Sequence, residues 1–225
     1  MRLTKHHGLG NDFLVLVDLD GTTPIDAGLA QAVCDRRRGV GADGLIRVSP
    51  GTGGADVTMS LRNADGSVAE MSGNGIRCLG QAVARARQVD VLELSVATGG
   101  GRRRVSVVPG PDARTAWVHV EMGPAGNRHP RWVSTEIVDG ATKTATVDVG
   151  NPHLVVLVDD PAAVDLLEVG PRLSAQFDHG SNVEVVAVAP GRRDTLDLRV
   201  WERGAGITEA CGTGAAAAAH AAYGW

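Results

Sequence analysis

The sequence has few cysteines. Only Cys34, Cys78 and Cys211 occur among 225 residues. An odd and sparse set argues against a disulfide framework and favours a reducing compartment. The first residues also contain no apolar signal core, so nothing in them indicates export. We therefore expect a cytoplasmic protein.

Long apolar runs and an excess of basic residues are also missing. No apolar stretch approaches the roughly 20 residues that a membrane-spanning helix needs. Lysine and arginine together number 22 against 26 acidic residues, which gives a formal net charge of −4. Without a broad cationic surface, nucleic acid is a poor partner. We expect neither a membrane nor a nucleic-acid ligand.

The usual cofactor and metal signatures are absent. Lys5 and Lys143 are the only lysines, and neither lies in a motif that would suit a pyridoxal-phosphate Schiff base. The glycine pairs at residues 73–75 and 204–206 lack the full dinucleotide spacing, and no P-loop string occurs. The histidines have no metal-ligand spacing. We expect no cofactor and no metal.

The most informative feature that is present is an internal duplication. Residues 70–75 (EMSGNG) resemble residues 209–214 (EACGTG). Three further pairs of short segments repeat in the same order at nearly the same spacing, such as residues 10–12 and 150–152. Repeats of this kind are the signature of two similar structural units.

Each copy predicts the same order of elements. A strand follows a Gly-Asn turn, a helical stretch comes next, and two more strands lead to a Gly-rich loop that opens a helix of small residues. We expect strands at residues 13–17, 44–48, 56–62, 116–121, 154–158, 183–189 and 195–200, with helical stretches at 24–37 and 161–176. We place the hinge within residues 109–148.

The fold that we predict is α/β of the α+β type, with two pseudo-symmetric domains at residues 1–123 and 124–225. Each is a strongly bent, mostly antiparallel sheet around a central helix, because helices of small residues allow sheet backbone to approach closely. The first copy continues past its motif helix with residues 89–109, whereas the second stops at Trp225. We therefore expect a second domain that is truncated at its C-terminus and leaves apolar helix surface exposed.

The two Gly-rich loops place side chains of reactive type at equivalent positions. Ser72 and Cys211 each precede a predicted helix, and helix N-termini offer unpaired N–H groups and a positive dipole end to an anion such as a carboxylate. Two such ends around one ligand fit removal of a proton from one face of a carbon and its return to the other. We expect the helix terminus to lower the pKa of Cys211 from its reference value of about 8.5.

Several segments, in order and over essentially the whole chain, resemble diaminopimelate epimerases. They are GLGNDF (8–13), GADGL (41–45), RNADGSVAEMSGNGIRC (62–78), GNPH (150–153), the run at 202–204 and EACGTGA (209–215). The resemblance implies cofactor-free, two-base conversion of LL-2,6-diaminopimelate to the meso form in lysine and peptidoglycan precursor synthesis. It also implies two pseudo-symmetric domains with the active site between them, and a further C-terminal segment.

The resemblance assigns roles to particular residues. Cys211 matches the second catalytic thiol, Ser72 stands at the first, and His153 and Glu202 match residues that set the protonation of the pair. Residues matching those that recognise the substrate or cradle its carboxylate are Asn11, Asn63, Gly73, Asn74, Asn151, Asn182, Arg203, Gly212 and Thr213. The implied partner is the small-molecule substrate. The sequence leaves the oligomeric state open, with a homodimer as one option.

Ser72 is the main departure from the family. A hydroxyl is water-like and far less acidic than a thiol, whose reference pKa is about 8.5, so ionising it costs on the order of 10 kcal/mol more. We expect impaired epimerisation. Three interpretations stay open: an engineered knock-out, a natural variant that still works, or a silent amino-acid-binding protein. Among enzymes, the alternative is a proline-racemase-like relative. Gly44 also departs, from a glutamine found in some members.

Overall fold

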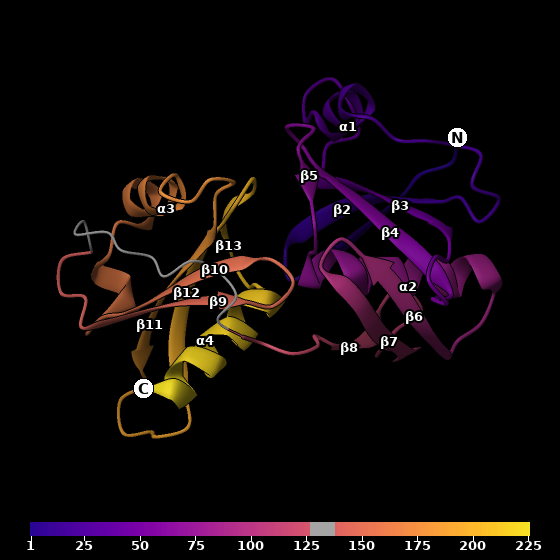
Figure 1. The fold of residues 1–225 in the computed structure, drawn as a ribbon. Coiled ribbons are helices and arrows are strands. Elements are labelled where there is room, and N and C mark those ends of the chain that lie inside the picture. Colours follow the sequence, from indigo (N-terminus) through magenta and orange to yellow (C-terminus); the bar gives the residue numbers. More distant parts are fainter. Residues whose placement is uncertain (127–137) are drawn as a thin grey trace. The chain divides into compact units, whose positions relative to one another are not determined.

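The structure is a computed structural model that describes residues 1–126 and 138–225. By its internal contacts the chain divides into two compact units, Met1–Gly123 (unit 1) and Pro124–Trp225 (unit 2). Figure 1 shows the elements of each unit with their labels. Each unit has a sheet of its own and a hydrophobic core of its own.

Unit 1 contains an eight-stranded sheet and two helices. Its strands run in the spatial order β1-β2-β3-β4-β6-β7-β8, with β5 paired to β4. The β2–β3 and β4–β6 pairs are parallel and the others antiparallel. The strands are β1 (Thr4–Gly8), β2 (Asn11–Val17), β3 (Gly44–Pro50), β4 (Val57–Asn63), β5 (Val68–Ala69), β6 (Leu92–Thr98), β7 (Gly101–Pro109) and β8 (Ala116–Glu121); the helices are α1 (Ala27–Cys34) and α2 (Gly73–Arg87).

The sheet of unit 1 curls around α2. This helix packs against β1 and β2 at one end of the strand order and against β7 and β8 at the other. Gly80 makes the close approach feasible, because a Cβ there would lie 3.0 Å from Val105 and 3.1 Å from Val107. On the outer face, α1 packs against β3 and β4.

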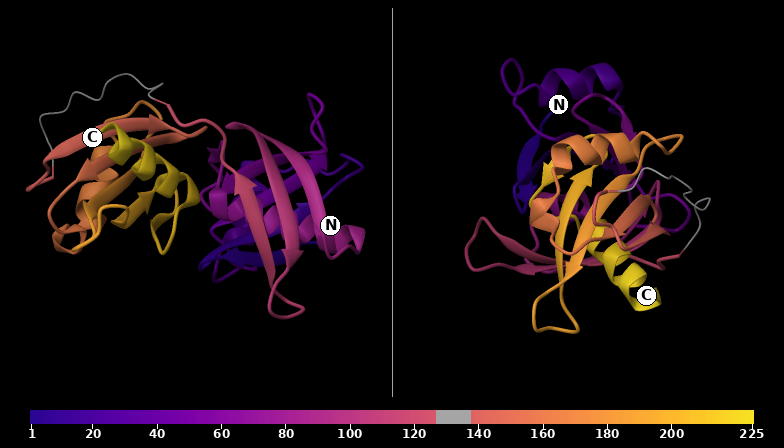
Figure 2. Two further views of the ribbon diagram at one scale, coloured as in Figure 1. Left: turned by 90° about the horizontal axis from the view of Figure 1, so that it is seen from below. Right: turned by 90° about the vertical axis from the view of Figure 1, so that its left-hand side faces the viewer.

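Unit 2 contains a five-stranded sheet in the order β13-β12-β11-β10-β9. The β10–β11 pair is parallel and the others are antiparallel. Helices α3 and α4 lie on opposite faces of this sheet (Figure 2). The elements are β9 (Lys143–Asp148), β10 (Pro152–Leu157), the 3₁₀ turn η1 (Pro161–Ala163), α3 (Leu166–Ser174), β11 (Asn182–Val188), β12 (Leu196–Glu202), β13 (Gly206–Thr208) and α4 (Gly212–Gly224).

The two units repeat one topology. The run β1–β2–α1–β3–β4–β5–α2 corresponds to β9–β10–α3–β11–β12–β13–α4, with the same parallel pair across the helix crossover. The α+β fold with two curled, mostly antiparallel sheets is therefore confirmed. The strand registers align the two copies: Phe13 lies opposite Gly44, as His153 lies opposite Asn182, so Gly44 is the equivalent of Asn182.

Strand alternation decides which side chains face which helix. In unit 2, Leu154 and Val183 join the core under α3. Their strand neighbours therefore point to the opposite face, which α4 covers along β9, β10 and β11. On that face α4 buries Thr213, Gly214, Ala217, Ala218 and Ala221.

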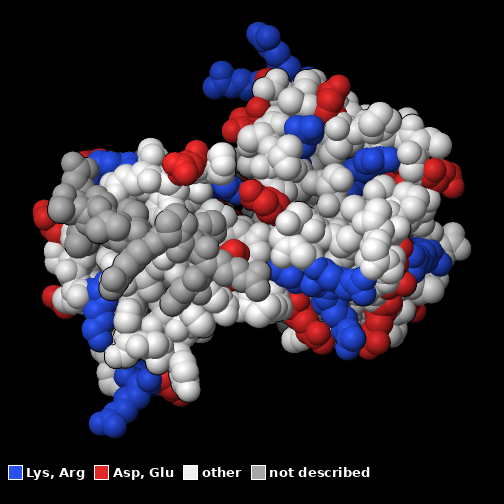
Figure 3. Space-filling model, in the orientation of Figure 1, with Lys and Arg blue, Asp and Glu red and all other residues white. Residues whose placement is uncertain are grey.

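None of the helices in the described ranges is long and apolar enough to cross a membrane. On the face drawn in Figure 3, basic and acidic side chains are both scattered over each unit, with uncharged surface between them.

Candidate functional site

Ser72 is the N-cap residue of α2. Its backbone is extended (φ −139°, ψ 123°), and its Oγ accepts a hydrogen bond from the Gly75 N–H at 3.0 Å. Serine is among the best N-cap residues because its short hydroxyl satisfies an N–H that the helix itself leaves unpaired. The Ser72 hydroxyl therefore has a structural role in addition to the predicted chemical one.

Cys211 occupies the same place in unit 2. It is the N-cap residue of α4, with φ −123° and ψ 113°, and its Sγ accepts from the Gly214 N–H at 3.3 Å. Only 5% of Cys211 is exposed. The expected helices therefore do begin directly after the two candidate residues, with Gly73 and Gly212 as their first members.

The prediction that the pKa of Cys211 is lowered is wrong. Burial raises the pKa of the Cys211 thiol, and the nearby carboxylates of Glu202 and Glu184 raise it further. Hydrogen bonds from Thr213 and the Gly214 N–H oppose this shift but do not cancel it. Loss of solvation and two like charges outweigh the helix terminus, so Cys211 is a protonated thiol at neutral pH.

Glu202 lies beside this thiol at the end of β12. Burial raises its pKa, while hydrogen bonds with Thr208 and Cys211 act in the opposite direction. The Thr208 hydroxyl donates to Glu202 Oε1 at 2.5 Å. A carboxyl group with a raised pKa is a stronger base than an ordinary carboxylate, and here it lies within hydrogen-bond reach of the thiol.

A buried chain of polar side chains leads from the sheet to Cys211. His153 Nδ1 lies 2.7 Å from Glu184 Oε1, and His153 Nε2 lies 3.0 Å from Asn151 Oδ1. Asn151 Nδ2 donates to Thr213 Oγ1 over a long 3.5 Å, and Thr213 Oγ1 lies 3.2 Å from Cys211 Sγ. Four residues predicted from the sequence thus meet in unit 2.

Glu184 is a member of this cluster that sequence reasoning missed. It is fully buried, at 0% exposure, in the middle of β11. A signal for it existed in the sequence, because a single glutamate stands within the otherwise apolar run VEVVAV that follows Asn182. Buried carboxylates are almost always paired, and His153 is its partner.

Asn182 and Arg203 meet near the start of β11. The Arg203 backbone N–H donates to Asn182 Oδ1 at 3.0 Å, and Asn182 Nδ2 donates to the Pro152 carbonyl at 3.0 Å. Arg203 Nη1 donates to the His179 carbonyl at 2.8 Å. The asparagine therefore ties the β12–β13 turn to β10 and sets the position from which Arg203 projects.

The predicted asparagines of unit 1 divide into a pair and a separate residue. Asn74 Nδ2 donates to Asn11 Oδ1 at 3.4 Å, and Asn11 Nδ2 donates to Asp43 Oδ2 at 2.8 Å. Both asparagines are buried. Arg77 donates to Asn74 Oδ1. Asn63 stands apart from them, with Nδ2 donating to Ser67 Oγ at 3.0 Å.

Unit 2 has a groove along α4 that reaches Cys211. Its volume is 610 Å³, and one wall is formed by the small residues of the helix, including Ala215, Ala218 and Ala222. The lining also includes Val188 and Leu196. Cys211 belongs to the lining at the N-terminal end of α4.

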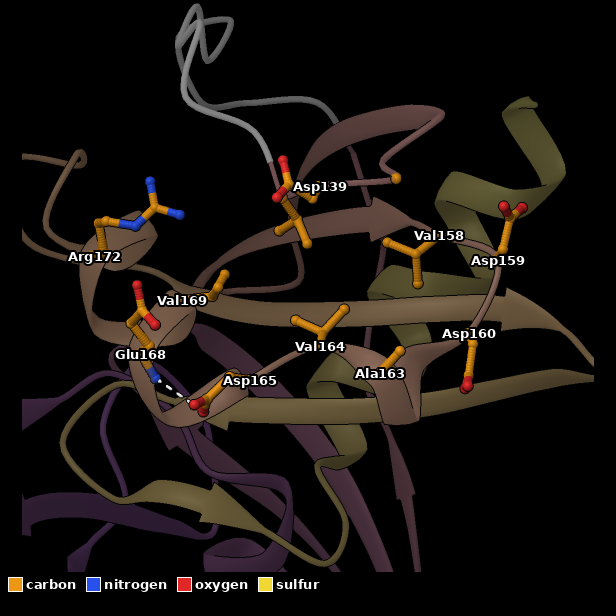
Figure 4. A pocket seen from close by; sticks show the side chains of 12 residues that line it. Asp139, Val158, Asp159, Asp160, Ala163, Val164, Asp165, Glu168, Val169 and Arg172 are labelled. Carbon is orange, nitrogen blue, oxygen red and sulfur yellow. Dashed lines mark hydrogen bonds between the residues drawn. The ribbon is translucent and has the colours of Figure 1, made fainter.

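A second pocket, of 440 Å³, is lined by residues of η1, α3 and the adjacent turns (Figure 4). It contains none of the predicted site residues. Its carboxylates are partly used within the chain, because Asp160 caps η1 and Asp165 caps α3. Over residues 1–126 and 138–225, no group of three or more His, Cys, Asp or Glu residues is arranged to hold a metal ion.

Comparisons with known proteins agree on one family. The sequence model of diaminopimelate epimerases matches residues 3–127 and 145–224. A diaminopimelate epimerase of Synechococcus elongatus is 41% identical over 233 residues, which cover 96% of this chain and 81% of the relative. Another, from Thermobifida fusca, is 42% identical over 237 residues, which cover 99% of this chain and 83% of the relative.

Solved structures of lower identity share the fold. A hydroxyproline epimerase from Agrobacterium vitis matches with a TM-score of 0.67 at 16% identity, covering 97% of this chain and 76% of that one. A PhzF-family phenazine biosynthesis protein from Bacillus anthracis matches with a TM-score of 0.63 at 15% identity, covering 98% and 76%. The fold is thus that of PhzF and proline-racemase-like epimerases.

Proposed function

Because the chain belongs to the diaminopimelate epimerase family, we propose that it interconverts LL- and meso-2,6-diaminopimelate without a cofactor. The α-hydrogen leaves as a proton from one face of the carbon, and a proton returns to the other face. The observation that carries the proposal is the matched capping geometry, in which Ser72 and Cys211 each begin the central helix of a repeated unit.

In this scheme residues 72 and 211 act on one α-carbon from opposite faces. Cys211 enters as the acid: burial keeps the proton on its sulfur until negative charge develops on the substrate. Glu202 and His153 are the neighbours that supply and withdraw protons at this thiol. The product feeds lysine and peptidoglycan precursor synthesis.

Recognition of the substrate falls to groups of both units. The first-turn residues Gly73, Asn74, Gly212 and Thr213 bind the reacting carboxylate, because helix N-termini favour anions. Arg203 suits the distal carboxylate, with which a guanidinium forms a paired, charge-assisted contact. The asparagines assigned to the substrate's amino and carboxylate groups are Asn11, Asn63, Asn151 and Asn182.

Ser72 limits this reaction. As a base it would have to ionise at a cost on the order of 10 kcal/mol above that of a thiol. The residue is better suited to its capping role than to proton removal. We propose that the chain as it stands is an impaired epimerase.

The test is exchange of the α-hydrogen with deuterated water, followed by mass spectrometry with no cofactor added. We expect Ser72→Cys to raise exchange from LL-diaminopimelate by several orders of magnitude. Cys211→Ala in the same background is the matched control and should abolish the gain. Absence of exchange in Ser72→Cys would contradict the proposal, and a preference for proline or hydroxyproline would move the chain to a different substrate.

A second candidate function is favoured by Ser72. A protein that caps α2 well but lacks a base at this place can bind the amino acid without turning it over. Calorimetry would then show saturable binding of diaminopimelate to the unmodified chain. Deuterium exchange would stay absent in that chain even after long incubation.

A further inference from the structure

The position of Glu184 is built into the packing of unit 2. Strand alternation turns Glu184 away from Val183 and Val185, which lie in the core under α3. Its carboxylate instead reaches α4, where a Cβ on Gly214 would lie only 2.6 Å from Glu184 Oε1. The helix therefore carries glycine where the carboxylate needs the space.

The neighbours of His153 determine where its protons lie. The Asn151 Oδ1 atom can only accept, so His153 Nε2, 3.0 Å away, must donate and carry a proton. A second proton lies between His153 Nδ1 and Glu184 Oε1, which are 2.7 Å apart. Without the negative charge of Glu184, a doubly protonated and fully buried imidazole would have no counter-charge.

The proton on Nε2 fixes the direction of the next hydrogen bonds in the chain. Because Asn151 accepts through Oδ1, its Nδ2 group is left to donate to Thr213 Oγ1. Since the Thr213 hydroxyl accepts there, its own proton is available to Cys211 Sγ at 3.2 Å. A hydrogen bond donated to sulfur stabilises the thiolate relative to the thiol.

The described residues of unit 1 include no equivalent of the His153–Glu184 pair. The glycine equivalent to Gly214 is Gly75, which packs against Ile46 rather than against a carboxylate. The strand register makes Phe13 the counterpart of His153. The ionisable pair is thus present beneath Cys211 and replaced by apolar side chains beneath Ser72.

We propose that Glu184 is a positioning residue for the acid–base chemistry of Cys211. It holds the proton on His153 Nε2 and thereby sets the direction of the hydrogen-bond chain His153–Asn151–Thr213–Cys211. Its Oε2 atom is buried and has no hydrogen-bond partner among the described residues, so the carboxylate is held at a cost to stability. The proposal rests on the proposed function, because it assumes that Cys211 exchanges a proton with substrate.

The first test does not need turnover. Nitrogen NMR of histidine-labelled protein reports which ring nitrogens carry protons, and His153→Gln assigns the His153 signal. In the unmodified chain at neutral pH we expect a proton on His153 Nε2. An unprotonated Nε2 there would overturn the proposal.

The second test removes the charge and keeps the shape. In Glu184→Gln the proposal requires that the amide oxygen accepts from Nδ1, which leaves a neutral His153 without the proton on Nε2. An amide that instead donates its NH2 group to Nδ1, with Nε2 still protonated, would overturn the proposal. We expect Asn151 to reverse its amide and Thr213 to turn its hydroxyl away from sulfur. Glu184→Asp keeps the charge and should retain the Nε2 proton. Glu168→Gln, the same change on the exposed face of α3, is the control and should change nothing.

The third test measures deuterium exchange in the Ser72→Cys background. For Glu184→Gln we expect kcat to fall about 10- to 100-fold, by analogy with the loss of groups that orient metal-bound histidines, with KM unchanged within about twofold. Glu184→Asp should recover part of kcat. Equal kcat in Glu184→Gln and the parent would overturn the proposal. If the Ser72→Cys parent shows no exchange, the proposed function fails, and the NMR result still decides the role of Glu184.

Discussion

Cys211 is more heavily surrounded by ionisable groups than its counterpart. Two carboxylates and burial keep its thiol protonated, and the hydrogen bonds of Thr213 and Gly214 moderate that effect. A cysteine at a helix N-terminus without such neighbours would have a lowered pKa. At this residue the neighbours, and not the helix terminus, decide the protonation state.

Gly214 is the residue on which this arrangement depends most directly. We expect Gly214→Ala to displace the Glu184 carboxylate from His153, because the new Cβ would lie 2.6 Å from Oε1. Overpacking of this kind destabilises by about 1–3 kcal/mol. Urea denaturation followed by circular dichroism checks the loss of stability.

Gly224→Ala is the matched control for that change. It lies in the same helix, and a Cβ there would meet no atom within 4 Å. Its unfolding midpoint should stay the same or rise slightly, since alanine favours helix over glycine. Equal midpoints for the two variants would show that Gly214 has room for a side chain.

At the scale of elements, an ion-pair network joins the end of α1 to the parallel pair of strands β2 and β3. Arg36, just after α1, pairs with Asp12 of β2 at 2.7 Å and with Asp43, before β3, at 2.7 Å. Asp43 also accepts from Asn11. The network therefore connects the crossover helix to the buried asparagine that is predicted to contact substrate.

We expect Arg36→Gln to lower the stability of unit 1. Because the Arg36 side chain is 56% exposed, solvent screening limits the loss to roughly 0.5–1 kcal/mol. Arg36 and Lys5 together lower the pKa of Asp12 against the opposing effect of burial. This contribution is therefore present above the unfolded pKa of about 3.9 and is lost as the pH falls below it.

The measurement is the urea midpoint as a function of pH between about 3 and 7. The difference between the parent and Arg36→Gln should be largest near neutral pH and should shrink in acid. Arg37→Gln, at the exposed neighbouring position, is the control. A difference that grows in acid would contradict the assignment to Asp12.

Much of this element order is predictable from local sequence. The strand expected at residues 44–48 is observed as β3, Gly44–Pro50, and the helices do begin after Ser72 and Cys211. In contrast, local sequence does not predict β1 and β9, because they owe their state to pairing with β2 and β10 and carry little periodic signal of their own.

The site is predictable only where a motif marks it. His153, Glu202 and Cys211 lie in recognisable segments and meet in unit 2. Glu184 becomes evident only from the parallel pairing that brings it to His153 from 31 positions away. The direction of the Cys211 pKa likewise depends on which carboxylates the fold brings near, and no local pattern contains that information.

At the scale of the whole molecule, the two units share a topology but differ in how the central helix is covered. In unit 1, β6, β7 and β8 complete the sheet around α2. In unit 2, α4 is covered by β9, β10 and β11, and its other side forms the groove that reaches Cys211. Near the C-terminal end of α4, Tyr223 is 95% exposed.

Unit 1 has a complete core within its own boundaries. Its main cluster joins β2, β3, β4, β6, β7 and α2, which predicts that residues 1–123 fold when expressed alone. The measurement is a two-dimensional amide NMR spectrum, which should be well dispersed, with a cooperative urea transition. Collapsed amide signals and no transition would show that unit 1 depends on the rest of the chain.

The parallel register of β10 and β11 also affects how the protein folds. His153 faces Asn182 and Val155 faces Glu184 across this pair. A slip of one residue would exchange the two sides of the strand, sending the glutamate into the valine layer and leaving the sulfur beside valine. Burying an unpaired carboxylate makes that misaligned form costly. Glu184 therefore favours the correct register of β10 and β11 over the slipped one during folding.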